Sequence, residues 1–286
     1  CVTGVQTCAL PISESGEDFH YQHYVAVLKN LNGLPLTVRT LDLGGDKLPE
    51  GSMDEENPFL GCRSIRWCLA NPEPFRAQIR AILRAGVHGP VRLMLPMITT
   101  IPELDRSLQI IDEVSDELRS EGVEFDENIP IGVMVEVPSL ALVAHHVAHR
   151  VSFLSVGSND LVQYTLAVDR GNEQVADLYD PLHPAVLQLI SSLIRVGEEH
   201  DIRVCLCGEM ASEVMHLPLL VGLGLREFSI TPQLIPEVKQ VIRHLVDYEV
   251  RDLASRCMQL SDGESISREL RLWSLENLPE VASRLI

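Results

Sequence analysis

The chain has 286 residues, 45% of them hydrophobic and 22% charged, which is enough apolar sequence for one compact globular domain with a large core. Its formal net charge of −18 disfavours nonspecific binding to nucleic acid or to an anionic membrane, because both would repel it. The seven cysteines lack paired spacing, which favours a reducing, cytoplasmic compartment, and the apolar runs are too short to span a membrane.

The first twelve residues differ from the rest of the sequence. Residues 1–12 read as the translation of a sequencing-library adapter, and an ordinary amphipathic pattern begins at Ser13. We exclude this segment from the fold prediction, as one would exclude a cloning scar. The remaining sequence is predicted to form a barrel domain over residues 13–250 and a C-terminal helical extension over residues 251–286.

Beyond Ser13 the sequence alternates short apolar runs with longer amphipathic stretches, which is typical of parallel strands joined by crossover helices. Seven runs predict strands, at 36–42, 60–65, 91–97, 131–137, 153–157, 203–207 and 227–230. The stretches that predict helices are 18–31, 73–85, 101–121, 140–149, 184–200 and 212–221, with further helical patterns at 250–260 and 267–275.

This alternation is compatible with a closed barrel or with an open doubly wound sheet. Nearly every predicted strand ends in a residue capable of chemistry, and only a barrel brings all its carboxyl-terminal strand ends to one mouth. A closed barrel of this kind has eight strands. We therefore predict an α/β fold, a (β/α)8 TIM barrel, with the first strand missing from this sequence.

Basic residues and glycines follow the first predicted strand. Arg39 and Lys47 flank a Gly-Gly turn, and glycines let a backbone approach a phosphate closely. Arg63 closes the short second strand, where its guanidinium can bind phosphate oxygens through two hydrogen bonds. The alternatives are an ordinary turn for the glycines and a surface ion pair for Arg63.

Carboxylates end two consecutive strands. Glu136 lies in an apolar strand, where its burial would be costly without a cation or hydrogen bonds, and Asn159 with Asp160 ends the next strand. Two such carboxylates suit Mg²⁺, which completes its octahedron with water and substrate oxygens. Caps or ion pairs are the alternative.

Two further residues extend this predicted site. Arg170 follows on the same loop as Asp160 and can clamp an anion, unless it pairs with Asp169 instead. Cys207 ends another strand, with Cys205 on the same side but farther from the mouth. A lone cysteine is more often buried filler, but a thiol beside arginines and a metal can exchange a proton with a substrate.

Together these motifs resemble the C-terminal barrel of enzyme I of the bacterial phosphoenolpyruvate:sugar phosphotransferase system. The resemblance spans residues 34–246, and the run QYTLAVDRGN favours enzyme I over the related pyruvate phosphate dikinases and phosphoenolpyruvate synthases. The strings that carry it, in the family's order, are TLDLGGDK, ENPFLGCRSIR, LMLPMI, GVMVEVP, SVGSNDLVQYTLAVDRGN, HPAVLQLI and CGEMAS.

The resemblance implies a role for each candidate residue. Arg39, Arg63 and Arg170 match arginines that bind phosphoenolpyruvate, and Lys47 lies in a matching motif. Glu136 and Asp160 match Mg²⁺ ligands. Asn159, with the backbone at Asp160, matches a contact to the substrate carboxylate. Cys207 matches the acid that protonates the enolate carbon.

The implied reaction transfers the phosphoryl group of phosphoenolpyruvate to a protein histidine and releases pyruvate. The sequence offers no glycine-rich segment with a histidine that fits the acceptor role, so we expect the acceptor, and the domain that docks a histidine-containing phosphocarrier protein, to lie upstream of this sequence. The resemblance also implies a homodimer formed through the barrel.

Two other functions remain open from the sequence. A Mg²⁺-dependent lyase or aldolase acting on pyruvate-like enolates would use the same carboxylates, but it would not need three arginines that face phosphate. A noncatalytic module that senses phosphoenolpyruvate or mediates dimerisation would keep the binding residues without turnover.

Overall fold

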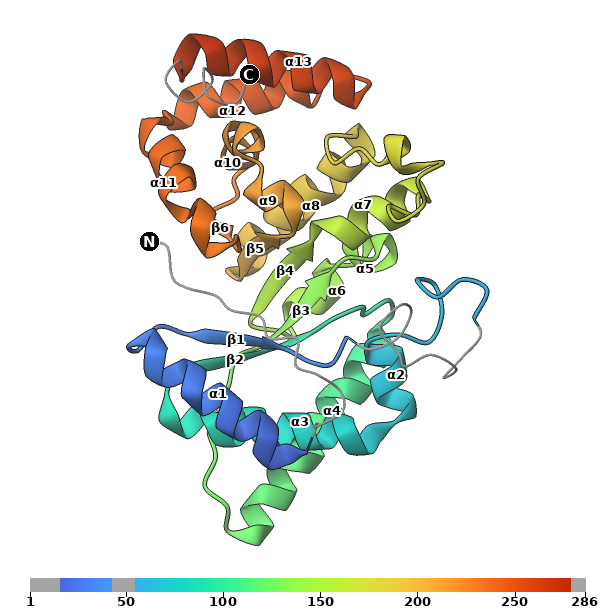
Figure 1. Ribbon diagram of the computed structural model, residues 1–286, viewed down its shortest axis with the longest axis vertical. Coiled ribbons are helices and arrows are strands. Elements are labelled where there is room, and N and C mark those ends of the chain that lie inside the picture. The colour runs from blue at the N-terminus through green and yellow to red at the C-terminus, as the bar shows by residue number, and fades with distance from the viewer. Residues whose placement is uncertain (1–15, 43–54, 279–286) are drawn as a thin grey trace. The chain divides into compact units, whose positions relative to one another are not determined.

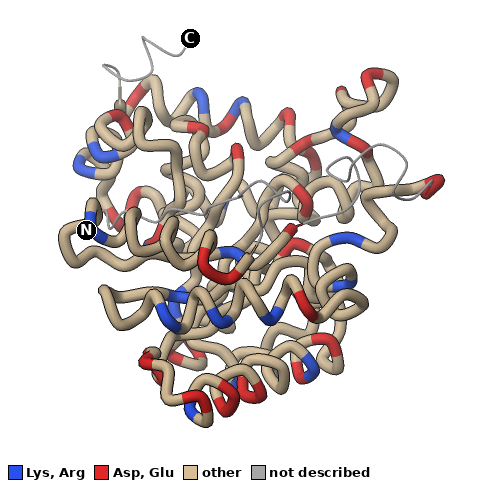
Figure 2. The backbone as a smooth tube through the Cα atoms, turned by 60° about the horizontal axis from the view of Figure 1, so that its bottom comes forward, with Lys and Arg blue, Asp and Glu red and all other residues tan. Residues whose placement is uncertain are grey.

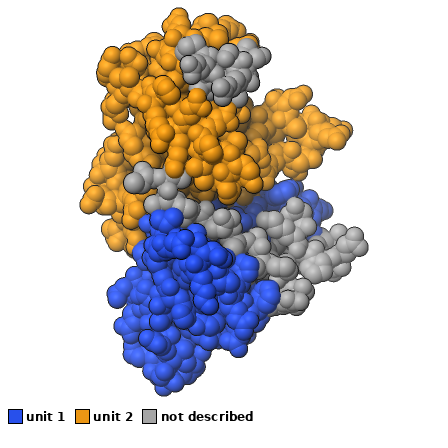
Figure 3. All heavy atoms as spheres, turned by 60° about the vertical axis from the view of Figure 1, so that its left-hand side comes forward, with its two compact units in different colours: residues 1–134 blue, residues 135–286 orange. Residues whose placement is uncertain are grey.

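The computed structural model describes residues 16–42 and 55–278 of the chain. These residues belong to two compact units, residues 1–134 and residues 135–286 (Figure 3). Each unit has its own strands, helices and core. Lys47 and the adapter-like segment, residues 1–12, lie outside the described residues.

The first unit is built on three parallel strands that follow one another in chain order. Leu36 of the first strand lies opposite Val91, and Leu93 lies opposite Ile131. The elements of the unit are α1 (Glu17–Leu31), β1 (Leu36–Arg39), α2 (Ile65–Ala70), α3 (Pro72–Ala85), η3 (Gly86–His88), β2 (Val91–Leu95), α4 (Ile101–Glu121) and β3 (Ile131–Val135).

The helices α1, α3 and α4 lie on one side of β1 and β2 (Figure 1). Their inner faces carry fully buried side chains such as Tyr24 of α1 and Ile79 of α3. Local sequence fixes the start of α4, because Thr100 and Glu103 form a capping box that satisfies the first backbone N–H groups. These helices therefore present one apolar face to the strands.

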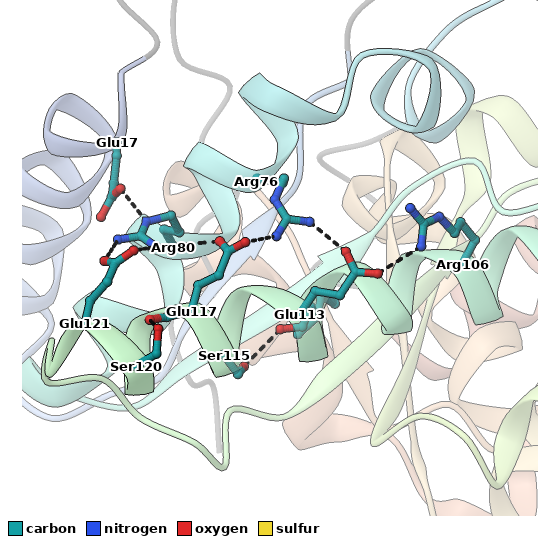
Figure 4. A network of polar contacts seen from close by, with 10 residues as sticks. Glu17, Arg76, Arg80, Arg106, Glu113, Ser115, Glu117, Ser120 and Glu121 are labelled. Atoms are coloured by element: carbon teal, nitrogen blue, oxygen red, sulfur yellow. Dashed lines mark hydrogen bonds and ion pairs between the residues drawn. The ribbon is translucent and has the colours of Figure 1, made fainter.

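The outer faces of the same helices are joined by ion pairs (Figure 4). Glu17 of α1 pairs with Arg80 of α3 at 2.6 Å, and Arg80 also pairs with Glu117 and Glu121 of α4. Arg76 of α3 continues the network toward the other end of α4. Acidic positions outnumber basic ones along the whole chain, 41 to 23. On these helices the charges are divided, because α3 is mainly basic and α4 mainly acidic, and Figure 2 shows the two kinds on neighbouring helices.

The second unit contains the other three parallel strands, again in chain order. Phe153 lies opposite Arg203, and Cys205 lies opposite Glu227. Its strands are β4 (Phe153–Gly157), β5 (Arg203–Cys207) and β6 (Glu227–Phe228). Its helices are α5 (Pro138–Leu142), α6 (His145–Ala148), α7 (Ser158–Leu166), η4 (Ala176–Leu178), α8 (Pro184–His200), α9 (Glu209–Ser212), η5 (Val214–His216), α10 (Leu217–Gly222), η6 (Pro232–Leu234), α11 (Ile235–His244), α12 (Asp247–Cys257) and α13 (Gly263–Asn277).

The last two helices pack closely on the rest of the second unit. A Cβ atom built on Gly222 of α10 would lie 2.0 Å from the carbonyl oxygen of Val250 in α12, so a side chain there would force the two helices apart. A Cβ on Gly263, at the start of α13, would lie 1.8 Å from Oδ2 of Asp180. Glycine at both positions allows the C-terminal helices to approach this closely.

The predicted α/β class with parallel strands is confirmed. The strands observed in the described residues are six of the seven predicted, and the strand predicted at 60–65 is wrong. The helix predicted at 140–149 is divided into α5 and α6, and α7, α9 and α11 were not predicted. Among the described helices, none combines the length and the apolar character needed to cross a membrane.

Candidate functional site

Arg39 is the last residue of β1, and the buried side chain of Gln78 in α3 holds this strand end. The Gln78 Oε1 atom accepts a hydrogen bond from Leu41 N at 2.8 Å, and its Nε2 atom donates to Tyr24 Oη at 3.1 Å and to Arg39 O at 3.4 Å. Backbone groups beyond the end of a strand need such partners when they are buried. Gln78 thus fixes the position from which Arg39 projects.

The two predicted phosphate-binding arginines of the first unit share one carboxylate. Asp42 Oδ2 lies 3.4 Å from Arg39 Nη1, and Asp42 Oδ1 lies 3.2 Å from Arg63 Nη2. The side chains of Asp42 and Arg63 are only 8% and 7% exposed, whereas Arg39 is 24% exposed. A single buried carboxylate therefore orients both guanidinium groups.

Arg63 lies in a turn before α2, and the prediction that it ends a strand is wrong. Pro58 and Gly61 bend the chain, with Leu60 N donating to Asn57 O at 2.9 Å and Gly61 N donating to Pro58 O at 3.4 Å. The apolar run is too short and too tightly turned to enter the sheet. The Arg63 guanidinium also lies 5.8 Å from the ring centroid of Phe59.

Glu136 follows β3 directly and is 3% exposed, as expected for a carboxylate that ends an apolar strand. Asp160 follows β4, the next strand along the chain, and is partly exposed. A divalent magnesium ion takes one or two protein carboxylates and fills its other positions with water and substrate oxygens. The described residues contain no group of three or more His, Cys, Asp or Glu side chains placed to hold a metal ion, so a magnesium ion held by Glu136 and Asp160 would take its other ligands from water and substrate.

Asn159 and Asp160 lie in the first turn of α7, which begins directly after β4. The prediction that Arg170 shares a loop with Asp160 is wrong, because Asp160 belongs to α7 and the rest of this helix, up to Leu166, lies between the two residues. Arg170 comes shortly after the end of this helix. Its backbone N–H donates to Oε1 of the buried Gln163 at 3.2 Å, which ties the Arg170 segment to α7.

Asn159 and Arg170 meet at the side chain of Glu209, the first residue of α9. Glu209 Oε1 accepts hydrogen bonds from Asn159 Nδ2 at 3.4 Å and from Arg170 Nη1 at 3.3 Å. Asn159 Oδ1 in turn accepts from Glu209 N at 2.9 Å. Tyr179 completes the group, since its hydroxyl donates to Asn159 O at 3.4 Å.

The pKa of Tyr179 depends on its burial and on the charged side chains around it. Its burial, together with the negative charges of Glu209 and Asp160, raises the pKa of Tyr179 to about 12, and Arg170 opposes the shift. A phenol with such a pKa stays protonated at neutral pH, so it acts here as a hydrogen-bond donor.

Cys207 ends β5 opposite Gly157, and Cys205 lies two residues earlier, opposite Ser155. The Cys207 thiol donates to Val156 O at 3.2 Å, and Ser155 Oγ donates to Cys207 Sγ at 3.7 Å. Both cysteine side chains are partly exposed, whereas Leu206 between them is fully buried. This alternation agrees with the predicted facing of the two thiols.

We expect Gly208→Ala to destabilise the second unit by about 1 to 3 kcal/mol, the usual cost of a strained backbone position. Gly208 has a φ of +96°, and a Cβ there would lie 2.4 Å from Ser158 Oγ and 2.7 Å from Asn159 Oδ1. Thermal unfolding measures the loss. Gly122→Ala is the matched control, because Gly122 also has a positive φ, +70°, but nothing within 4 Å of the added carbon. Equal losses in the two variants would contradict the steric part of this explanation.

The comparison with protein families decides where this chain belongs. Residues 7–246 match the family described as PEP-utilising enzyme, PEP-binding domain, where PEP is phosphoenolpyruvate. The chain belongs to this family. Among relatives of this PEP-binding domain are two enzymes called phosphoenolpyruvate-protein phosphotransferase. The one from Cupriavidus necator is 42% identical over 90% of this chain, and the one from Staphylococcus carnosus is 43% identical over 87%.

The chain spans about 44% of the length of each of these two relatives. Solved structures share its fold at low sequence identity. A malate synthase from Haloferax volcanii aligns over 98% of this chain and 83% of its own, with a TM-score of 0.54 and 13% identity. A citrate lyase from Burkholderia xenovorans covers 93% and 83%, with a TM-score of 0.51 and 17% identity. At such identities the likeness concerns the fold alone.

Sequence reasoning missed three residues that support the candidates in this PEP-binding domain. Asp42 and Gln78 hold the arginine end of β1, and Tyr179 contacts the first turn of α7. Asp42 lies in a quoted motif, so an acidic residue three positions after Arg39 was an available signal. Gln78 and Tyr179 carry no sequence signal, since each reaches its partner only through the packing of a distant element.

Proposed function

We propose that this chain is the PEP-binding barrel of a phosphoenolpyruvate-protein phosphotransferase, which passes a phosphoryl group from PEP to a histidine outside these 286 residues. The observation that carries the proposal is the 42–43% identity to two enzymes of that name over most of this chain. The motif order supports it as well. We further propose that the protein is a cytoplasmic homodimer. The phosphoryl group on its histidine then passes to a histidine-containing phosphocarrier protein.

In the proposed reaction the bond between phosphorus and the enol oxygen of PEP breaks and a bond from phosphorus to a histidine nitrogen forms. Arg39, Arg63 and Arg170 are proposed to neutralise the anionic substrate, and Asn159 to bind its carboxylate. The electron pair of the broken bond stays on the enol oxygen, which gives the enolate of pyruvate. Cys207 donates its proton to the methylene carbon, which becomes the methyl group of pyruvate, and water returns a proton to the thiolate.

Glu136 and Asp160 are proposed to hold Mg²⁺, which when bound supplies positive charge that offsets the negative charge of the substrate. The positions of the two residues support this, because Glu136 directly follows β3 and Asp160 lies in the first turn of the helix that follows β4, the next strand along the chain. Lys47 is proposed as a further basic residue near the substrate, and this proposal rests only on its place in the motif TLDLGGDK.

We expect Glu136→Ala to abolish the Mg²⁺ dependence of PEP binding and to weaken binding at saturating Mg²⁺ by at least about tenfold. Isothermal titration calorimetry with and without Mg²⁺ measures both effects. Glu199→Ala is the control, since Glu199 is exposed near the end of α8, which leads back to the opposite end of β5. Equal affinities with and without Mg²⁺ in the unmodified protein would remove the metal from the proposal.

A further inference from the structure

The carboxylate of Glu209 occupies the hydrogen-bond donors that the proposed function assigns to the substrate. Asn159 Nδ2 and Arg170 Nη1 both point to Glu209 Oε1, at 3.4 and 3.3 Å. These groups are the amide and the guanidinium proposed to bind the carboxylate and neutralise the charge of the ligand. An internal anion and an external one therefore have the same two partners.

The exposure of this ion pair distinguishes it from the one in the first unit. Glu209 and Arg170 are 74% and 40% exposed, whereas Asp42 and Arg63 are 8% and 7% exposed. A buried pair is costly to break, because its charges lose their compensation away from water. An exposed pair contributes little, since water solvates both partners when they separate. Asp42 is thus a permanent partner of Arg39 and Arg63. The Glu209 carboxylate, in contrast, can be replaced by another anion as the partner of Arg170.

The attachment of Glu209 allows its carboxylate to leave while its backbone stays in place. Glu209 N donates to Asn159 Oδ1 at 2.9 Å, and this bond does not involve the carboxylate. The preceding Gly208 permits the close approach of the two segments. Movement of the Glu209 side chain alone would therefore leave Asn159 oriented and its Nδ2 atom available to another acceptor.

We propose that Glu209 is an internal counter-anion that competes with the ligand for Arg170 and Asn159 and so lowers the affinity of the site for carboxylate-bearing anions. This inference rests on the proposed function, in which the ligand is PEP. The ligand carboxylate displaces the Glu209 carboxylate into solvent, and the cost of that exchange is subtracted from the binding free energy. Glu209 thereby keeps the affinity below the value that the other residues would give.

The test is Glu209→Gln in the full chain, titrated with PEP in the presence of Mg²⁺ by calorimetry. Glutamine has the same size but no charge, so we expect binding about two- to fivefold tighter, the range that corresponds to an exposed ion pair. In an Arg170→Ala background the gain should shrink to less than about twofold, because the competed guanidinium is absent. Glu213→Gln, four residues along the chain, is the matched control and should bind as the unmodified protein does.

A second probe separates failure of this inference from failure of the proposed function. Oxalate, a dicarboxylate without a phosphoryl group, is titrated in Mg²⁺-free buffer and followed by the side-chain amide NMR signals of Asn159. If PEP does not bind but oxalate binds two- to fivefold tighter to Glu209→Gln, the proposed function fails and the counter-anion stands. Unchanged or weaker binding of both probes by Glu209→Gln would overturn the inference, and so would an equal gain in Glu213→Gln.

Discussion

Replacing Cys207 with alanine should slow exchange of the pyruvate methyl protons with solvent deuterium by about 10²- to 10⁴-fold, the usual contribution of a general acid or base. The group that gives a proton to the enolate must also remove one from pyruvate in the reverse direction. This reaction needs no acceptor histidine, so it can be followed on the full chain with Mg²⁺ and pyruvate by proton NMR. The PEP affinity of the variant should stay within about threefold of that of the unmodified protein. The reason is that the thiol donates a hydrogen bond to Val156 O, accepts one from Ser155 Oγ and is not a proposed substrate ligand.

Cys205→Ala is the matched control for this experiment. Cys205 faces the same side of β5 but lies two residues earlier, opposite Ser155, so its loss should affect packing without a comparable loss of exchange rate. Normal exchange in Cys207→Ala together with lost exchange in Cys205→Ala would show that the proton donor has been assigned to the wrong thiol.

Replacing Asp42 with alanine should lower the free energy of unfolding of the first unit by about 3 to 5 kcal/mol, the cost of removing one partner from a buried ion pair. The side chains of Asp42 and Arg63 are 8% and 7% exposed, and the same carboxylate also pairs with Arg39. Asp42→Asn should cost less, because an amide oxygen still accepts a hydrogen bond from a guanidinium. The orientation of both arginines should be lost in the alanine variant.

The sequence provides a separate fluorescent probe for each unit, since its two tryptophans are Trp67 and Trp273. Urea unfolding of Asp42→Ala in a Trp273→Phe background therefore reports on the first unit alone. The control is Asp18→Ala, which removes a carboxylate that is 80% exposed and paired with Arg84, and it should cost at most about 1 kcal/mol. Similar losses in the two variants would mean that burial does not strengthen the Asp42 pair.

Regular periodicity made most of the fold predictable from the sequence. The strands at 153–157 and 203–207 were predicted with their observed bounds, because each is a short apolar run between polar segments. The strand at 60–65 failed because Pro58 and Gly61 turn the chain before an apolar run can extend. The helix α7 was missed because Ser158, Asn159 and Asp160 read as a polar strand end, although such residues also favour the first turn of a helix.

The chemistry of the candidate site was predictable at strand ends and unpredictable wherever a contact depends on packing. The observed positions of Asn159, Cys207 and Glu136 follow from strand ends in the sequence. The pairing of Arg39 with Asp42 is local, but that of Arg63 with Asp42 joins residues 21 positions apart. No periodicity encodes such a distance, and the same holds for the contact of Arg170 with Glu209, 39 positions apart.

The close fit of Gly263 against Asp180 has a consequence for anyone shortening the gene. The family match ends at residue 246, which invites a cut before α12. Yet α12 rests against Gly222, and the start of α13 rests against Asp180, the neighbour of the Tyr179 that donates to Asn159. A deletion of α12 and α13 would remove the helices that contact Gly222 and Asp180, and with them the support of the segment that reaches Asn159 through Tyr179. A shortened second unit should therefore extend through Asn277, the last residue of α13.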